Sequence, residues 1–431
     1  LTYEEPGFRN TPTKQLVRAA VVLKLSSFDF LVKHADTLFK LGRSLLGGKL
    51  FGNLMTATFY GQFCPGQTYE DIHEATYAMR EAGIIPLLAV PTEEDSKLAV
   101  GMDVESWYKE NTRRTIECIN IGSRFGIQGF PRFLQIKLTA LIDQELCILL
   151  ILLLIMLIMP EHPIHLLMRY LQEKLGQYVQ LDMLSKEENL HLNESLARFE
   201  EICKHGSKCG VHLYVDAEYI SINPALYLLS KAMLLRHNKT KPVLQVTIQA
   251  YLKSAKNETE KILKFCRDAD IVFGAKIVRG AYLVAEKARA ETQGYENPIC
   301  NSLEATHDNY NEIVESLLRR ISRNRNGKIH VMVASHNEDS VTRVVKRLHD
   351  FGIDHMRGDV VFAQLYGLSD HVTNWLGANN YPVYKSTPCG SVEETMPYLY
   401  RRAQENNRII KGGKRDRTLI NIELSKRLRQ L

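Results

Sequence analysis

The chain of 431 residues is 45% hydrophobic and 24% charged, which is typical of an ordinary soluble globular protein. Its length fits a single α/β barrel as well as two or three smaller domains. The formal net charge of +6 is mild. It favours anionic ligands or an anionic membrane surface, and it is too diffuse to indicate nucleic acid.

The eight cysteines are scattered without the spacing of a disulfide framework, which predicts reduced thiols in an intracellular compartment. Cys203 and Cys209 flank His205, but no second pair accompanies them, so we expect no metal site. The sequence begins at Leu1 rather than Met, and we take any targeting peptide to have been removed or left out.

Residues 1–82 are interpreted as a helical arm that packs on a larger domain. Apolar residues recur at helical spacing over 15–46, and Gly47 with Gly48 is expected to end this helix. A second helix is expected around 69–82 and closes at Gly83. An amphipathic start of this kind could also be a remnant of a targeting segment.

From Gly83 onward, short β-rich runs alternate with longer helical stretches. The runs are 84–90, 133–139, 211–216, 243–249, 271–278, 329–334, 360–363 and 383–384. Strands that alternate with helices predict right-handed βαβ units, and eight such units predict a (βα)8 barrel of the TIM type over 83–410. Asn223 is expected to cap the helix after the third strand, with Pro224 at its first position.

Polar residues stand at the predicted strand ends, where the active sites of such barrels lie. They are Thr92, Lys137, Asp216, Glu218, Gln249, Arg279, Tyr282, His336, Asn337, Gln364 and Ser386. Thr92 and Asn337 can equally cap the helices that follow. Lys137 lies within the run LQIKLTAL, and a buried lysine there would need a partner. A cationic, partly acidic barrel mouth suits a small anion, a phosphate-bearing cofactor, or both.

The last helix of the barrel contains YLYRRAQEN at 398–406, in which Tyr398, Arg401, Arg402 and Glu405 cluster on one side. Two adjacent guanidiniums beside a phenol and a carboxylate form a clamp for an anion, because Arg suits bidentate recognition of a carboxylate. The alternative is a solvated basic face.

Residues 146–159 (LCILLILLLIMLIM) are apolar throughout, which an outer barrel helix should not be. The run is shorter than the ~20 residues of a membrane span, so it is a membrane-contacting patch, a helix covered by a partner, or an anomaly of this sequence. Residues 411–431 form a charged helical tail. No phosphate loop and no G-x-G-x-x-G motif is present in the sequence.

Several motifs at successive strand ends make the chain resemble the proline dehydrogenase family of flavoenzymes. They are VDAEYISINPAL (215–226), TIQAYLK (247–253), KIVRGAYL (276–283), VASHNED (333–339) and YLYRRAQEN. The resemblance runs from about residue 59 to about 407 and fails over roughly 142–200. It implies a distorted (βα)8 barrel whose last helix lies over the barrel mouth.

The resemblance also implies non-covalently bound FAD, a set of cofactor contacts and a set of substrate contacts. The cofactor contacts would be Gln249, Lys276, Arg279, Gly280, Tyr282, His336, Asn337 and Glu405. The substrate carboxylate would be held by Lys137, Arg401 and Arg402, with Asp216 ordering that cationic group and Leu365, Ser386 and Tyr398 shaping the pocket. The resemblance implies no catalytic base and no metal.

In this family a hydride passes to flavin N5 from the ring carbon next to the amine of a cyclic amino acid, and the electrons pass to a membrane quinone. By this resemblance we expect a mitochondrial enzyme at the matrix side of the inner membrane, peripheral to it. Ser386 in YKSTPCGSVEE (384–394) resembles the branch that oxidises 4-hydroxy-L-proline, where proline-specific members carry tyrosine. We therefore expect hydroxyproline oxidation with proline as the weaker substrate. An inactive barrel acting as a scaffold and an integral membrane protein are the alternatives.

Overall fold

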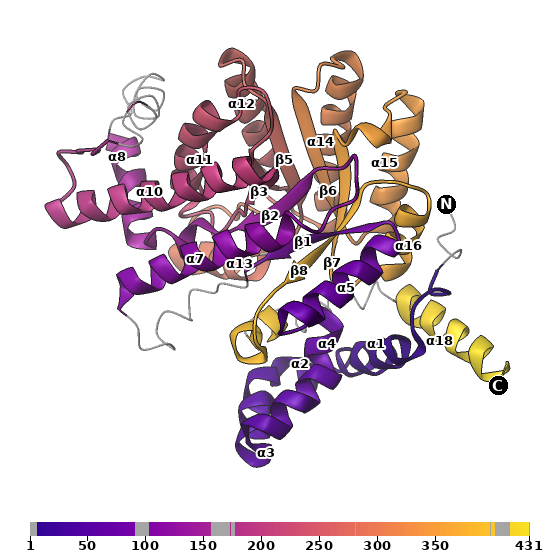
Figure 1. Ribbon diagram of the computed structural model, residues 1–431. Helices are drawn as coiled ribbons and strands as arrows, with labels where there is room; N and C mark the ends of the chain where they lie inside the picture. Colours follow the sequence, from indigo (N-terminus) through magenta and orange to yellow (C-terminus); the bar gives the residue numbers. More distant parts are fainter. Residues whose placement is uncertain are drawn as a thin grey trace. The chain divides into compact units, whose positions relative to one another are not determined.

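Eight parallel strands form a closed barrel in the computed structural model of the protein and follow one another in chain order (Figure 1). The structure describes residues 7–90, 103–156, 173, 177–280, 282–396, 398–400 and 414–430. The strands are β1 (Ile84–Ala89), β2 (Arg132–Ile136), β3 (Val211–Val215), β4 (Leu244–Gln249), β5 (Phe273–Val278), β6 (Ile329–Ala334), β7 (Val360–Leu365) and β8 (Val383–Pro388). The predicted (βα)8 barrel is confirmed, and each predicted run coincides with one strand.

Three strands, β2, β7 and β8, end two or more residues away from the predicted position. β7 and β8 continue to Leu365 and Pro388, so Ser386 lies within a strand and pairs with Leu365 in register. β2 ends at Ile136, and the chain turns at Lys137 into the short 3-10 helix η1 (Leu138–Ala140). The apolar pattern continued past the strand because the residues of η1 are themselves buried.

The chain divides into two compact units, and the larger one comprises residues 97–124 and 129–361. Within this unit, Gln245, Thr247 and Gln249 alternate with apolar residues along β4, and all of them are buried. They share one face of the strand because successive side chains point to opposite faces. A Cβ atom on Gly274 of β5 would lie 2.4 Å from the Cγ atom of Gln245, so the glycine leaves room for that side chain.

Several helices of the larger unit begin with a side-chain cap. The helices of this unit that the structure describes are α7 (Val104–Gly122), α8 (Gln144–Met156), α10 (Lys186–Cys209), α11 (Asn223–His237), α12 (Ala255–Asp268), α13 (Leu283–Gln293), α14 (Leu303–Arg323), α15 (Glu338–Asp350) and the 3-10 helix η2 (His355–Arg357). The caps that accept a backbone N–H are Asp103, Ser185, Ser302, Asn337 and Asp354. The prediction for Asn223 is wrong: Ile222 is the N-cap residue of α11, and the Asn223 side chain has other partners, described below. Pro224 is the second residue of α11, one position later than predicted.

The apolar run begins in α8, whose described side chains lie in two environments. Cys147 and Leu150 are fully buried, whereas Ile148 and Leu152 are 42% and 48% exposed. A described face of α8 therefore belongs to the protein core, where α8 packs against α11. Residues 157–159 of the run lie outside the described residues. None of the helices that the structure describes is both long and apolar enough to cross a membrane.

The smaller unit comprises residues 1–96, 125–128 and 362–431. Its helices are α1 (Thr13–Leu25), α2 (Asp29–Lys33), α3 (Ala35–Ala57), α4 (Phe59–Phe63), α5 (Tyr69–Glu81), α16 (Asp370–Ala378) and α18 (Lys414–Leu428). The single helix predicted over 15–46 is wrong. The chain turns after α1, where the Ser27 hydroxyl donates to the Lys24 carbonyl at 2.6 Å. At Gly47 the backbone takes φ 72° and ψ 160°, which are not helical, so α3 consists of two helical segments that meet at a kink there, and a helical segment does end at Gly47 as predicted.

A buried apolar cluster holds the helices of this unit together. It contains Leu16, Val22, Phe51, Met55, Tyr60, Phe63, Leu399 and Ile420, among others. α18 is fixed to α16 by Asp416, whose carboxylate accepts from the Ser369 amide at 2.9 Å and contacts His371 Nδ1 at 2.5 Å. None of the eight cysteines of the chain forms a disulfide in the structure.

Candidate active site

The carboxyl ends of β2 to β6, all in the larger unit, hold the polar residues that the sequence singles out there. Lys137 follows β2, Asp216 follows β3 and Gln249 ends β4. Arg279 follows β5 directly, and His336 stands two residues after β6. In a parallel barrel these ends lie on one face, so these side chains belong to a common surface.

Lys276 of β5 is a buried cation with a carboxylate partner. Its Nζ atom donates to Asp216 Oδ1 at 2.5 Å and to Gln135 Oε1 at 2.8 Å. The side chain of Lys276 is 7% exposed, against 26% for that of Asp216. The ammonium also lies 5.8 Å from the centre of the Tyr214 ring. The Asp216 carboxylate therefore stays partly exposed to solvent while the lysine is held in place.

Glu218 is a second buried carboxylate near Lys137. Its two oxygens accept hydrogen bonds from the Thr139 amide at 3.3 Å and the Thr139 hydroxyl at 2.7 Å. Burial raises the pKa of the Glu218 carboxyl, while the positive charge of Lys137 acts in the opposite direction. Glu218 therefore ties the segment after β2, which contains Lys137, to the segment after β3.

The backbone of Glu218 is held by two amide side chains. Asn223 accepts from the Glu218 amide at 2.8 Å and donates to its carbonyl at 3.1 Å. Gln249 donates to the same carbonyl at 2.9 Å, and its Oε1 accepts from Asn223 Nδ2 at 2.9 Å. Both side-chain amide atoms of Gln249 are thus bonded within the protein, and the residue is 2% exposed.

Arg279 has uncharged partners. Its guanidinium contacts His307 Nδ1 at 3.1 Å and Ser340 Oγ at 3.2 Å, and it also donates to the Ser335 hydroxyl. Its Cζ atom lies 4.0 Å from the centre of the Tyr310 ring. Burial lowers the pKa of Arg279, and the described part of the chain provides no carboxylate in an ion pair with it. A positive charge partly removed from water and held by neutral groups is suited to an anionic ligand.

The chain beside Arg279 leaves room for a ligand. Gly280 has φ 89°, and among the described residues, apart from its two chain neighbours, no atom lies within 4 Å of the place where a Cβ atom would stand. The Tyr282 ring packs at a tilt against that of Tyr219, with the centroids 4.6 Å apart. Half-buried His336 precedes Asn337, whose side chain accepts from the Ser340 amide at 2.8 Å and caps α15.

In the smaller unit, the ends of β7 and β8 bring together Leu365 and Ser386, both half-buried. The neighbouring Lys385 is 3% exposed and is neutralised by Asp370 at 2.7 Å, so it is a structural cation. Tyr398 is 9% exposed and belongs to the apolar cluster of this unit. Arg401, Arg402 and Glu405 lie outside the described residues, as does most of the predicted last helix.

Comparisons of sequence with known proteins decide the family, and a comparison of structure shows the fold. The family described as Proline dehydrogenase matches residues 107–412. Hydroxyproline dehydrogenase of Xenopus laevis is 37% identical, covering 99% of this chain and 90% of that protein. "Proline dehydrogenase 1, mitochondrial" of Homo sapiens is 29% identical over 99% of this chain and 89% of its own length. A crystal structure of proline utilization A from Bdellovibrio bacteriovorus aligns with a TM-score of 0.67 at 16% identity, and this chain covers 40% of that longer chain.

The chain belongs to the proline dehydrogenase family. The predicted resemblance is confirmed, and the protein is an oxidoreductase with proline or hydroxyproline dehydrogenase activity. The structural comparison confirms the barrel fold independently of sequence identity.

Within this family fold, several partners of the predicted site residues were not assigned a role from the sequence. Gln135 holds Lys276, and Ser335 and His307 hold Arg279. Glu218 was noted only as a polar strand end. Ser335 directly follows β6, and this position is a signal that could have identified it. His307 lies inside α14, and sequence spacing alone does not bring it to Arg279.

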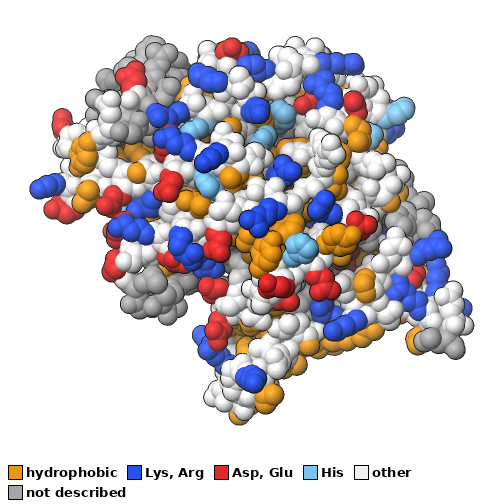
Figure 2. All heavy atoms as spheres, in the orientation of Figure 1, with side chains coloured by type: hydrophobic (Ala, Val, Ile, Leu, Met, Phe, Trp, Pro, Cys, Tyr) orange, Lys and Arg blue, Asp and Glu red, His pale blue; other side chains and the backbone are white. Residues whose placement is uncertain are grey.

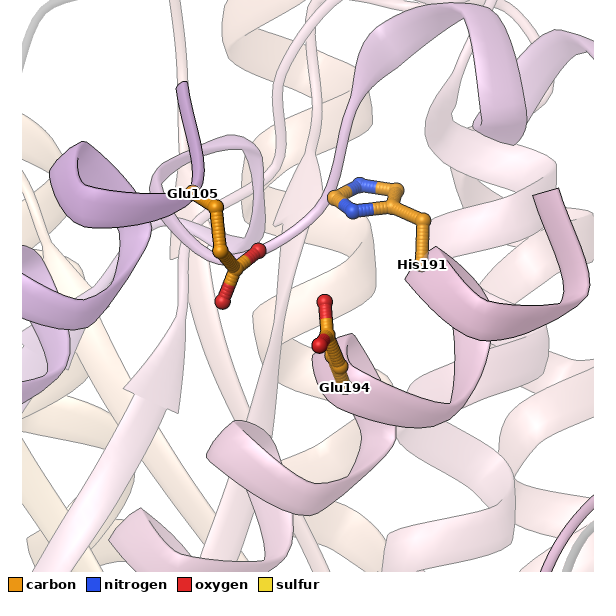
Figure 3. Close-up of side chains that lie close together, drawn as sticks. All are labelled: Glu105, His191 and Glu194. Atoms are coloured by element: carbon orange, nitrogen blue, oxygen red, sulfur yellow. The ribbon is translucent and has the colours of Figure 1, made fainter. Parts of the chain in front are cut away.

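A separate cluster of Glu105, His191 and Glu194 has the composition of a metal site (Figure 3). Their ligand atoms all lie within 4.8 Å of one another. However, His191 Nε2 accepts a hydrogen bond from the Asp143 amide at 3.1 Å, so a neutral ring carries its proton on Nδ1. A metal at Nδ1 would require that proton to leave while Nε2 still faces a donor. Burial and the Glu105 carboxylate raise the pKa of Glu194, which favours a shared proton at this cluster.

Proposed function

We propose that the protein oxidises 4-hydroxy-L-proline to 1-pyrroline-3-hydroxy-5-carboxylate, with L-proline as a weaker substrate. The observation that carries the proposal is the higher identity to hydroxyproline dehydrogenase than to proline dehydrogenase over the same share of the chain. Ser386 supports it, because a small hydroxyl-bearing residue within β8, near its carboxyl end, leaves space for a substituted ring and can bond its hydroxyl.

The residues of the larger unit fit FAD as the cofactor. The Arg279 guanidinium has neutral partners and lacks an ion pair in the described residues, which suits a phosphate. The open space at Gly280 allows close approach of a ligand to the backbone. We propose that Lys276, Tyr282, His336 and Asn337 complete the cofactor contacts together with Glu405. For Gln249 we propose a positioning role through Glu218, because its own amide is already bonded.

When bound, FAD supplies the acceptor for a hydride. The protein then has to bind and orient the substrate. We propose that Lys137, Arg401 and Arg402 bind the carboxylate, so that the C–H bond next to the amine is held in one direction. Nearby cations lower the pKa of the substrate amine and favour its neutral form, from which a hydride leaves more readily. This scheme uses no general base from the protein.

The electrons then pass, in this proposal, to a quinone in a membrane that the protein contacts from one side. A related proline dehydrogenase is named mitochondrial, and we propose the matrix side of the mitochondrial inner membrane for this protein. The resemblance of the sequence motifs to the proline dehydrogenase family supports both the proposed quinone acceptor and the proposed location.

The substitution Ser386→Tyr tests the substrate. The tyrosine ring should exclude the 4-hydroxyl group, so kcat/KM for trans-4-hydroxy-L-proline should fall while that for L-proline is kept or rises. The control Ser386→Ala removes only a hydrogen bond and should change the ratio of the two values by about 2- to 12-fold, from 0.5–1.5 kcal/mol. An unchanged substrate ratio in Ser386→Tyr would refute this role for Ser386.

A further inference from the structure

The helix α3 has apolar side chains on two faces, and the protein covers one of them. On the covered face, Phe51 and Met55 are 7% and 2% exposed and belong to the apolar cluster of the smaller unit. The Phe39 ring packs on the same side, 5.8 Å from that of Phe59. A helix with one face in a core ordinarily carries polar residues on its other face.

The other face of α3 is instead a row of leucines, which we call the leucine face. It consists of Leu38, Leu41, Leu45, Leu46, Leu50 and Leu54, with exposed fractions from 36% to 75%. Before the kink Leu38, Leu41 and Leu45 are three or four positions apart, and after it Leu50 and Leu54 are four apart, so within each half these residues lie on one side. Phe28 and Phe30 at the start of α2, which packs against α3, are 48% and 67% exposed. Exposed apolar patches of this kind are typical of surfaces that meet a partner.

The helices that carry the leucine face have a positive charge. Residues 29–57, which contain α2 and α3, include four Lys or Arg and two Asp or Glu. Arg43 pairs with Glu393 at 2.9 Å, while Lys33, Lys40 and Lys49 are exposed. In the view of Figure 2, hydrophobic and basic side chains lie next to one another at the lower end, where Figure 1 labels α3.

We infer that the leucine face of α3, with Phe28 and Phe30, docks on the surface of an anionic lipid bilayer. A helix with exposed leucine and phenylalanine beside lysines lies in the interface of such a membrane, with its apolar side chains among the acyl chains and its cations at the headgroups. α3 lies on the membrane and does not cross it, because Lys40, Arg43 and Lys49 interrupt its apolar sequence. The inference rests on the proposed transfer of electrons to a membrane quinone and specifies the contact surface.

A second copy of this chain fits the leucine face less well. In a two-fold dimer the same patch meets itself, so the lysines of both copies would be brought together. Like charges across an interface are unfavourable, whereas anionic headgroups neutralise them.

The experiment measures binding of the full-length protein to vesicles of phosphatidylcholine with and without phosphatidylserine, by co-sedimentation, without substrate or acceptor. We expect binding to the anionic vesicles and at least tenfold weaker binding after Leu45→Glu with Leu50→Glu. Leu303→Glu, at a 64% exposed leucine of α14, is the matched control and should bind like the unaltered protein. Lys33→Gln and Lys49→Gln should each weaken binding to anionic vesicles by about fivefold.

Equal binding by the double glutamate variant and the unaltered protein would overturn the inference. Absence of vesicle binding by the unaltered protein would also overturn it. So would light scattering that shows a dimer for the unaltered protein and a monomer for the double variant. If that variant fails to fold by circular dichroism, Leu50→Trp with brominated lipids decides the question: quenched fluorescence supports docking, and unquenched fluorescence refutes it. Turnover of 4-hydroxy-L-proline with a water-soluble dye as acceptor tests the proposed activity separately, and the double variant should retain it.

Discussion

The buried ion pair between Lys276 and Asp216 allows a quantitative test of what holds the barrel interior together. Asp216→Asn removes the negative charge and keeps the size of the side chain. Lys276 is then left 7% exposed with an uncharged amide and Gln135 as partners. Breaking a buried pair in this way costs about 3–5 kcal/mol. Because the Asp216 side chain is 26% exposed, water can partly replace it, and we expect a loss near the lower end, about 3 kcal/mol.

The assay is equilibrium unfolding in urea, followed by far-ultraviolet circular dichroism and by tryptophan fluorescence, whose transitions must coincide. Lys276→Met removes the buried cation and leaves a carboxylate that water can reach, so its cost should be smaller, about 1 kcal/mol. The double variant should be no less stable than Asp216→Asn alone. The double-mutant cycle should then give a coupling energy of at least about 1 kcal/mol.

A matched control is Lys385→Met, which removes a buried lysine that has its own carboxylate partner, Asp370, in the smaller unit. Its effect should add to that of Asp216→Asn without coupling. The reasoning is refuted if Asp216→Asn costs less than about 1 kcal/mol and the Lys276 cycle gives a coupling below about 0.5 kcal/mol. Lys276 would then be stabilised by groups other than Asp216.

Three further predictions concern other parts of the chain. The pKa of Glu194 is raised in the folded protein, so the folded state binds this proton more tightly than the unfolded state. The contribution of Glu194 to stability therefore decreases as pH rises from its ordinary pKa near 4.5 through the raised value. Glu194→Gln should raise the melting temperature at pH 8 relative to the unaltered protein, with a smaller difference at pH 5. On α8, Leu152→Glu should leave the melting temperature nearly unchanged and improve solubility. Leu150→Glu, at a fully buried position, should prevent folding or lower stability by several kcal/mol. Equal outcomes for the two variants would contradict the two environments described for this helix. Arg279→Gln should abolish retention of FAD absorbance through gel filtration while circular dichroism is unchanged, and Arg279→Lys should restore it partly; full retention in Arg279→Gln would remove this residue from the cofactor contacts.

The repeating pattern of the sequence determined the barrel. A parallel strand buried on both faces needs a short apolar run, and each helix between strands needs a longer amphipathic one, so the alternation of the two can be read locally. The polar residues at the strand ends could be predicted from the same pattern, because Asp216, Gln249 and Arg279 interrupt the apolar runs. Sequence motifs at these ends were sufficient to predict the family that the comparisons confirm.

The choice of hydrogen-bond partners could not be predicted from the sequence. Asn223 had the position and chemistry of a helix cap, yet its side chain holds the Glu218 backbone and Gln249. The Asn223 amide can form its hydrogen bonds equally well as a helix cap or in these contacts. Which of the two occurs depends on the tertiary packing that brings the ends of β3 and β4 together. Arg279 meets His307 for the same kind of reason, because α14 reaches the end of β5 through packing and not through sequence spacing.

Burial of the apolar helices was likewise decided by tertiary structure. The run in α8 is apolar all round, so its composition contains no signal for which side faces inward; the structure buries Leu150 and exposes Leu152. The same ambiguity exists in α3, where Phe51 lies in a core and the neighbouring Leu50 is exposed to solvent. Hydrophobic periodicity identifies an inner face only when the outer face is polar. Where both faces are apolar, the neighbouring elements decide which one the protein covers.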